Sequence, residues 1–130
     1  MSNESFFFRG LIIFSLINAV GILYFAPIDP VAASEPLNFL DYLGIVYLLV
    51  WLLSLILLFR FNRVGRPLFT IIIALGIFLM LALPPYAQAP TNVYQVFNWL
   101  AGAVDGALLV MLYLTSVSDQ FSRSKLPKEN

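Results

Sequence analysis

The sequence contains no cysteine and no histidine, and only 11% of its 130 residues are charged. Without cysteine there is no disulfide, thiol nucleophile or thiolate metal site, and without histidine there is no imidazole base and no usual zinc or haem ligand. An enzyme needs an acid/base pair, a nucleophile or a metal, and the sequence offers one isolated carboxylate and some tyrosines. We therefore expect no catalytic activity, no metal site and no cofactor.

Net charge is also lacking, because seven basic residues balance seven acidic ones. A neutral chain has no overall field that would attract nucleic acid, so no nucleic-acid partner is expected. Hydrophobic residues make up 61% of the chain, against about 45–50% in an ordinary soluble domain. This composition predicts an integral membrane protein with membrane lipids around it.

Four apolar runs cover most of the chain, at residues 6–26, 39–59, 68–83 and 93–117. A bilayer core about 30 Å thick needs about 20 apolar residues in a helix, and the runs lack the alternation of membrane strands. The third run is short and is expected to recruit Pro67 at its first position or the segment toward Tyr86. Asn38, with Asp41 three residues on, resembles an N-cap for the second run. The sequence predicts an all-α, up-down-up-down bundle of four transmembrane helices in one domain, residues 1–130.

The basic residues all fall on one side of this four-span topology, whereas the loops at residues 27–38 and 84–92 contain none. By the positive-inside rule, the side with the basic residues is cytoplasmic. Both termini and the loop between the second and third spans would lie there, most simply at a bacterial inner membrane. The seven basic residues are Arg9, Arg60, Arg63, Arg66, Arg123, Lys125 and Lys128.

Two alternatives concern the organisation of the chain. Arg9, an apolar stretch and the small residues 31–33 resemble a cleaved signal peptide, but the one-sided topology requires the first span, so we expect it to be kept. Residues 20–23 resemble residues 75–78, and residues 40–43 resemble residues 97–100, in the same helix–loop–helix order. The two hairpins are therefore either a parallel duplication or two apolar segments that are similar by chance.

Asp105 is the one acidic residue well inside an apolar run, near the expected membrane midplane or slightly toward the outer side. A carboxylate at this depth costs about 2.5–3.5 kcal/mol, and such residues usually face the bundle interior. It shares a helical stripe with Asn98 and Gly102, and Gly102 and Gly106 form a GxxxG pair, which allows another helix to approach closely.

Two interpretations of this polar site stay open. Asp105 is a proton or cation site, or it is an interhelical hydrogen-bonding group with a partner such as Asn18, Tyr47 or Asn98. The other polar intramembrane groups are Asn18, near the middle of the first span, and Ser54, in the second. Asn18, like Asn98, is included in the predicted intramembrane polar site. The sequence alone does not choose between these roles.

Arg60, Arg63 and Arg66 form a basic loop that faces lipid headgroups or a partner. This cluster either only fixes the topology or also binds anionic headgroups or the acidic face of another protein. The soluble parts are too short for a catalytic or ligand-binding domain. We therefore expect a small accessory or assembly subunit of a larger membrane complex, or a homo-oligomer. The alternative is an oligomeric proton- or ion-coupled transporter or channel that uses Asp105.

Overall fold

The computed structural model describes residues 3–26, 36–82 and 91–121, and five helices account for most of them. This confirms the predicted all-helical class. The helices are α1 (Asn3–Phe25), α2 (Phe39–Phe59), α3 (Gly65–Ala82), α4 (Asn92–Leu114) and the short α5 (Val117–Gln120). Residues 1–2, 27–35, 83–90 and 122–130 lie outside the described ranges. What the sequence predicts for most of the two loops without basic residues, for the signal-peptide segment and for Arg123, Lys125 and Lys128 therefore stays a prediction.

Three of the helices, α1, α2 and α4, are long and apolar enough to cross a membrane. The apolar part of α3, Gly65–Leu81, is shorter; the 18 residues of α3 span about 27 Å at 1.5 Å per residue. In each long helix only 22% of the most apolar stretch is buried inside the molecule. A chain with this composition and this much outward apolar surface fits a multi-pass membrane protein, in agreement with the coarse prediction.

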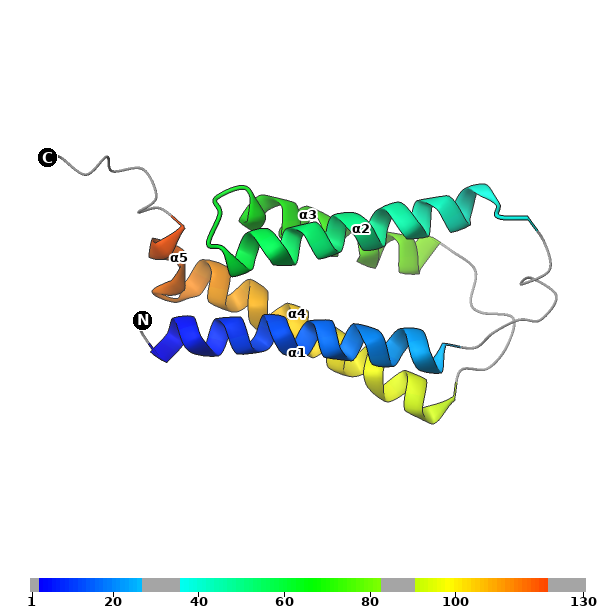
Figure 1. The fold of residues 1–130 in the computed structure, drawn as a ribbon, viewed down its shortest axis with the longest axis horizontal. Helices are drawn as coiled ribbons and strands as arrows, with labels where there is room; N and C mark the ends of the chain where they lie inside the picture. The colour runs from blue at the N-terminus through cyan, green and yellow to red at the C-terminus, as the bar shows by residue number, and fades with distance from the viewer. Residues whose placement is uncertain (1–2, 27–35, 83–90, 122–130) are drawn as a thin grey trace, which may run out of the picture.

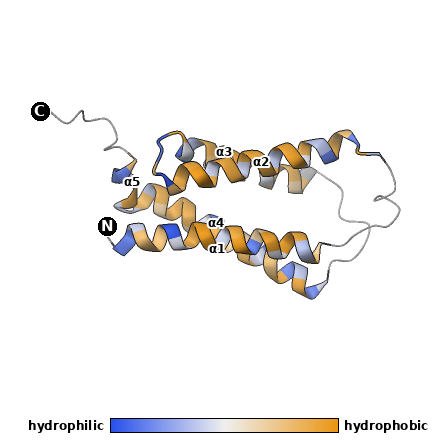
Figure 2. Cartoon of the chain, in the orientation of Figure 1, coloured by the Kyte–Doolittle hydropathy of each residue, from blue (hydrophilic) through white to orange (hydrophobic). Residues whose placement is uncertain are grey.

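The four long helices run antiparallel in the predicted up-down-up-down order (Figure 1). The start of α1, the loop between α2 and α3, and the end of α4 all lie at the same end of the bundle. This end carries Arg9, Arg60, Arg63 and Arg66, and we call it the basic end. Figure 2 shows apolar residues along the middle of the helices and hydrophilic residues toward their ends. The described part of the chain therefore keeps its basic residues on one side.

The helices associate as two pairs, α1 with α4 and α2 with α3. The buried face of α1 consists of residues spaced by three or four, which form one stripe toward α4; they are Ser5, Phe8, Ile12, Ser15 and Asn18. Further along, the ring of Phe97 lies against Gly21 and stacks on Phe25 at 5.6 Å. The α1–α4 pair is thus in contact over most of its length.

The two pairs meet mainly in the half of the bundle near the basic end. There Trp51, Leu55 and Leu58 of α2 and Phe69 and Ile72 of α3 pack in one apolar core with residues of α1 and α4. In the other halves of α2 and α3, over residues 39–50 and 73–81, no described residue is buried. The outer half of the α2–α3 pair is consequently not covered by α1 or α4.

The helix ends confirm some predicted boundaries and correct others. Asn38 and Asp41 form a reciprocal capping box, in which Asn38 Oδ1 accepts from Leu40 N at 2.8 Å and Asp41 Oδ2 accepts from Asn38 N at 2.8 Å. Helix α2 therefore has its predicted limits, 39–59.

The other three predicted spans differ at their ends. Helix α1 begins at Asn3, three residues earlier than predicted, and α3 begins at Gly65, so Pro67 is its third residue; proline is tolerated there because first-turn N–H groups have no intrahelical partner. The prediction that the fourth helix extends to Val117 is wrong. It ends at Leu114, because Thr115 is extended (φ −121°, ψ 172°) and its Oγ1 bonds Met111 O and Val117 N.

Candidate functional site

Asp105 lies on α4, two residues from the helix midpoint, which is about 3 Å of rise. It is on the basic side of that midpoint, whereas the sequence suggested the midplane or the outer side. The residue is half-buried, and its Oδ1 atom is buried without a hydrogen-bond partner among the described residues. A carboxyl oxygen without a partner in an apolar environment is costly, so this atom marks an incomplete interaction.

Asn18 and Asn98, the two asparagines of the predicted polar site, do not pair with Asp105. Asn18 Nδ2 donates to the Phe97 carbonyl at 2.9 Å, and Asn98 Nδ2 donates to the carbonyl of Tyr94 at 3.0 Å, one turn earlier on the same helix. Both asparagines act at a level about 10 Å from Asp105 along α4. Among the described residues these three polar side chains therefore share no hydrogen bond, and Asn18 joins α1 to α4; their role as one intramembrane site stays a prediction.

Tyr47 of α2 is the expected partner that does lie near Asp105. Tyr47 is close enough to Asp105 for an electrostatic interaction, and the Tyr47 hydroxyl lies against Gly76 of α3. The phenol therefore lies in the contact between α2 and α3. No hydrogen bond joins the two side chains among the described residues, so this is an electrostatic neighbour and not a completed hydrogen-bond pair.

Gly102 and Gly106, the predicted packing glycines, lie on an exposed face of α4. A Cβ atom added at either position would meet nothing within 4 Å. Helix α3 reaches this face only two turns further on, where Thr70 Oγ1 and the Tyr113 hydroxyl are 2.8 Å apart. The GxxxG pair is thus not used for packing inside the described part of the molecule. We call residues 98, 102, 105 and 106 the α4 face.

A second concentration of polar and aromatic groups lies at the basic end. The rings of Phe8, Phe61 and Phe121 contact one another, with centroids 5.3–6.2 Å apart. The guanidinium of Arg9 lies 5.0 Å from the Phe59 ring and 5.1 Å from the Phe61 ring. Such cation–π contacts are worth about 0.5–2 kcal/mol each. Arg9, which the sequence marked only for topology, therefore also fixes α1 to the α2–α3 loop.

The three arginines of the basic loop differ in their surroundings. Arg60 is exposed and caps α2, where its backbone N–H bonds the Ile56 carbonyl at 3.2 Å. Arg63 and Arg66 instead line a cavity of about 290 Å³ together with Pro67, Tyr113 and Phe121. The Arg66 guanidinium lies 4.7 Å from the Tyr113 ring and 5.7 Å from the Phe121 ring. Arg63 and Arg66 thus share a cavity, whereas Arg60 does not line it.

Sequence reasoning missed Tyr113 and Thr70, whose hydroxyl contact ties α4 to α3. They are 43 residues apart, and no local spacing predicts such a pair. It also missed the buried serines of α1, Ser5 and Ser15. Ser5 lies three residues before Phe8 and Ser15 three residues after Ile12. This spacing was a usable signal, because it marks one helical stripe.

Within residues 3–26, 36–82 and 91–121 there is no cluster of acidic side chains that could hold a metal ion. Comparison of the chain with models of protein families, with curated proteins and with solved structures finds no match. The candidate functional sites of the described chain are therefore the α4 face and the cavity at the basic end.

Proposed function

We propose that this protein is an accessory or assembly subunit that binds a helix of a larger membrane protein through the α4 face. In this proposal all four long helices cross a membrane, such as a bacterial inner membrane, and the basic end is cytoplasmic, as the positive-inside rule indicates. The observation that carries the proposal is the open space at Gly102 and Gly106. Small residues at helical spacing let another backbone approach closely, and this chain leaves that face bare.

Asp105 supplies a second and independent argument for a partner on the α4 face. Its unpartnered Oδ1 atom lies at the edge of the stripe that carries the two glycines. That atom is buried inside the chain, so a donor on an incoming helix would meet it after the Asp105 side chain turns toward the α4 face. Such a hydrogen bond is worth about 1–2 kcal/mol in model transmembrane helices. The uncovered outer half of the α2–α3 pair, with exposed side chains such as Ile45, Leu49 and Phe78, offers further apolar surface nearby.

Substitution of Gly102 and Gly106 by leucine tests the docking proposal. We expect the wild-type protein, extracted in mild detergent, to elute with its partner. The amount of complex recovered with the Gly102→Leu/Gly106→Leu variant should be at least about tenfold lower, because two leucines hold the helices apart. The monomer should stay folded, since neither Cβ meets an atom of the chain within 4 Å and leucine is a better helix former than glycine. The measurement is the mass of the eluting complex by light scattering and mass spectrometry.

Gly10→Leu provides a matched control. An added Cβ at this glycine also meets nothing within 4 Å, but it lies on α1, near the basic end. It should leave the complex intact. A wild-type protein that elutes as a lone monomer, or a control that disrupts the complex as strongly as the α4 variant, contradicts the proposal. A mass that is a whole multiple of 14.6 kDa identifies the partner as a second copy of this chain.

A second candidate function is proton or cation coupling at Asp105. The observation that favours it is the buried, unpartnered Oδ1 atom of Asp105, because unpaired carboxyl groups at membrane depth often lie on ion pathways. Four short helices enclose little space, so this function would require an oligomer.

Asp105→Asn distinguishes the two candidates, because an amide still forms hydrogen bonds but cannot carry a proton or a charge. For the docking function we expect the amount of complex recovered with Asp105→Asn to stay within about twofold of wild type. With Asp105→Leu the recovered amount should fall about tenfold, as expected for the loss of a hydrogen bond of about 1–2 kcal/mol. The measurement is the recovered complex, with pH-dye flux in vesicles beside it. Wild-type flux that Asp105→Asn abolishes while the complex remains would instead establish the coupling function.

A further inference from the structure

We propose that the cavity at the basic end binds one anionic phosphate group, carried either by a phospholipid headgroup or by a soluble phosphate compound. This inference does not depend on the proposed docking function, because the cavity and the α4 face are different surfaces. It goes beyond the sequence, which treated Arg60, Arg63 and Arg66 as one basic cluster. The structure selects two of the three and gives them a shared space.

The shape and size of the cavity fit a small ligand group. Its volume of about 290 Å³ is at the lower limit of the range of ligand pockets, about 300–1,000 Å³. Phe121 forms a buried wall, whereas Arg63 and Pro67 are exposed. The site is therefore bounded by protein on one side and accessible on another.

The charges that line the cavity are of one sign. Arg63 and Arg66 both contribute to it, and among the described residues that line it none is acidic. Two guanidinium groups beside one cavity repel each other unless an anion lies between them. Planar guanidinium groups bind phosphate through paired N–H donors, which makes arginine the usual residue for this ligand.

The Arg66 side chain is held in place before any ligand binds. Its guanidinium lies 4.7 Å from the Tyr113 ring, and the Tyr113 hydroxyl is 2.8 Å from Thr70 Oγ1. Thr70 Oγ1 in turn lies 3.0 Å from the Arg66 carbonyl, to which it donates. A contact to the ring face leaves the N–H edge of the guanidinium available, so little side-chain entropy is lost when an anion binds.

The position of the cavity along the bundle matches a phosphate-bearing membrane surface. Arg66 is the second residue of α3, and the apolar run of this helix follows it directly. In the proposed topology this level is the cytoplasmic interface, where anionic lipids are concentrated and attract basic side chains. A phospholipid beside α3 and α4 would place its phosphate at this height.

Binding of defined lipids to the full-length protein in detergent tests the inference by native mass spectrometry. We expect phosphatidylglycerol to form a saturable one-to-one complex, and Arg66→Gln and Arg63→Gln each to weaken it about tenfold, as expected for a lost charge-assisted hydrogen bond. Arg60→Gln is the matched control. It removes the same charge from the same loop but does not line the cavity, so it should change the affinity less than about twofold.

A second variant separates the cavity from general electrostatic attraction. Tyr113→Leu keeps every charge but removes the ring beside Arg66, and we expect a loss of about threefold to tenfold, in line with a cation–π contact. Arg63 is exposed, so Arg63→Gln should fold normally. If Arg66→Gln does not fold, Arg63→Gln still tests the inference. Equal losses for Arg60→Gln and Arg63→Gln, or the absence of any saturable complex, would overturn the inference.

The same experiment identifies the source of the phosphate group. If millimolar inorganic phosphate leaves the lipid complex unchanged, and zwitterionic phosphatidylcholine binds more weakly than phosphatidylglycerol, the ligand is an anionic lipid. If inorganic phosphate displaces the lipid in an Arg63-dependent and Arg66-dependent way, the ligand is a soluble phosphate compound. Either result supports the proposed chemistry.

Discussion

Replacement of Phe8 by alanine is expected to lower the free energy of unfolding by about 3 kcal/mol, at the lower end of the range for buried phenylalanines. The Phe8 ring is 0% exposed and contacts the rings of Phe61 and Phe121. Its removal leaves a cavity where α1, the α2–α3 loop and the segment after α5 meet. The loss of stability stays near 3 kcal/mol because lipid is as apolar as the protein interior. Moving the side chain between the two therefore contributes little, and the lost packing contacts contribute most of the effect.

Phe61 is the residue to which the effect of the Phe8 substitution should spread. Its backbone has φ 53°, which is unusual for a residue other than glycine and costs about 1–3 kcal/mol. Contacts of its ring with Phe8, Phe121 and Arg9 hold this conformation. Without the Phe8 ring one of these contacts is lost, so the loop can relax away from the bundle.

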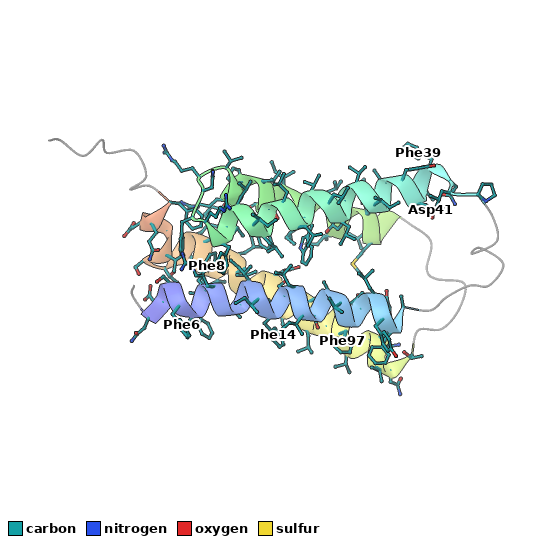
Figure 3. The ribbon with its side chains drawn as sticks, viewed as in Figure 1. Phe6, Phe8, Phe14, Phe39, Asp41 and Phe97 are labelled. Atoms are coloured by element: carbon teal, nitrogen blue, oxygen red, sulfur yellow. The ribbon has the colours of Figure 1, made fainter. Side chains whose placement is uncertain are left out.

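The measurement for Phe8→Ala is a dodecyl sulfate titration of the detergent-solubilised protein, followed by helical circular dichroism. Phe6→Ala is the matched control, since Phe6 is two residues away on the same helix but 75% exposed. Figure 3 shows Phe6 on the outer side of α1 and Phe8 toward the other helices. The control should change stability by less than about 0.5 kcal/mol. Similar losses for both variants would mean that the ring cluster does not stabilise the fold.

Helix limits were predictable from the sequence where the signal is local. The start of α2 follows from Asn38 and Asp41, because a capping box depends only on residues three apart. The end of α4 was not predictable in this way. Thr115 and Ser116 lie in an apolar run, and the helix stops because the Thr115 hydroxyl bonds nearby backbone groups in place of the helical pattern.

The candidate site was predictable only in part. Asp105 could be identified from its chemistry, because a carboxyl group within an apolar span is costly and is usually paired or functional. Its neighbour could not be chosen among Asn18, Tyr47 and Asn98, since that choice depends on which helices pair. The pairs α1 with α2 and α3 with α4 were equally open, but α1 packs against α4 and α2 against α3. Asn18 therefore meets the Phe97 carbonyl instead of Asp105.

The glycines show the same limit of sequence reasoning. The GxxxG pair Gly102 and Gly106 was predicted as a packing site, yet inside the described chain the close approaches occur at Gly65, beside the α2 backbone, and at two other glycines, Gly21 and Gly76. These two glycines occupy matching positions in the weak internal similarity between residues 20–23 and 75–78. Each lies against an aromatic side chain of the helix paired with its own, Phe97 for Gly21 and Tyr47 for Gly76. Pattern alone does not say which glycine meets a helix of the same chain.

Substitution of Gly65 by alanine is expected to destabilise the protein by about 3 kcal/mol, at the upper end of the range for overpacking. A Cβ atom at this position would lie 2.9 Å from the backbone nitrogen of Leu58 and 3.0 Å from the carbonyl carbon of Leu57. Backbone atoms cannot rotate away as a side chain can. The last turn of α2 is also fixed, because Phe61 N bonds Leu58 O at 2.9 Å and Asn62 N bonds Leu57 O at 2.8 Å.

The Gly65→Ala variant therefore has to separate the start of α3 from the end of α2. Gly44→Ala is a sharp control because the expected sign is opposite. Gly44 lies inside α2 with nothing within 4 Å of an added Cβ, so alanine should stabilise the helix by up to about 1 kcal/mol. Both variants are compared in the same dodecyl sulfate titration. If Gly65→Ala is as stable as Gly44→Ala, the close approach of α3 to the α2 backbone is not a feature of the folded protein.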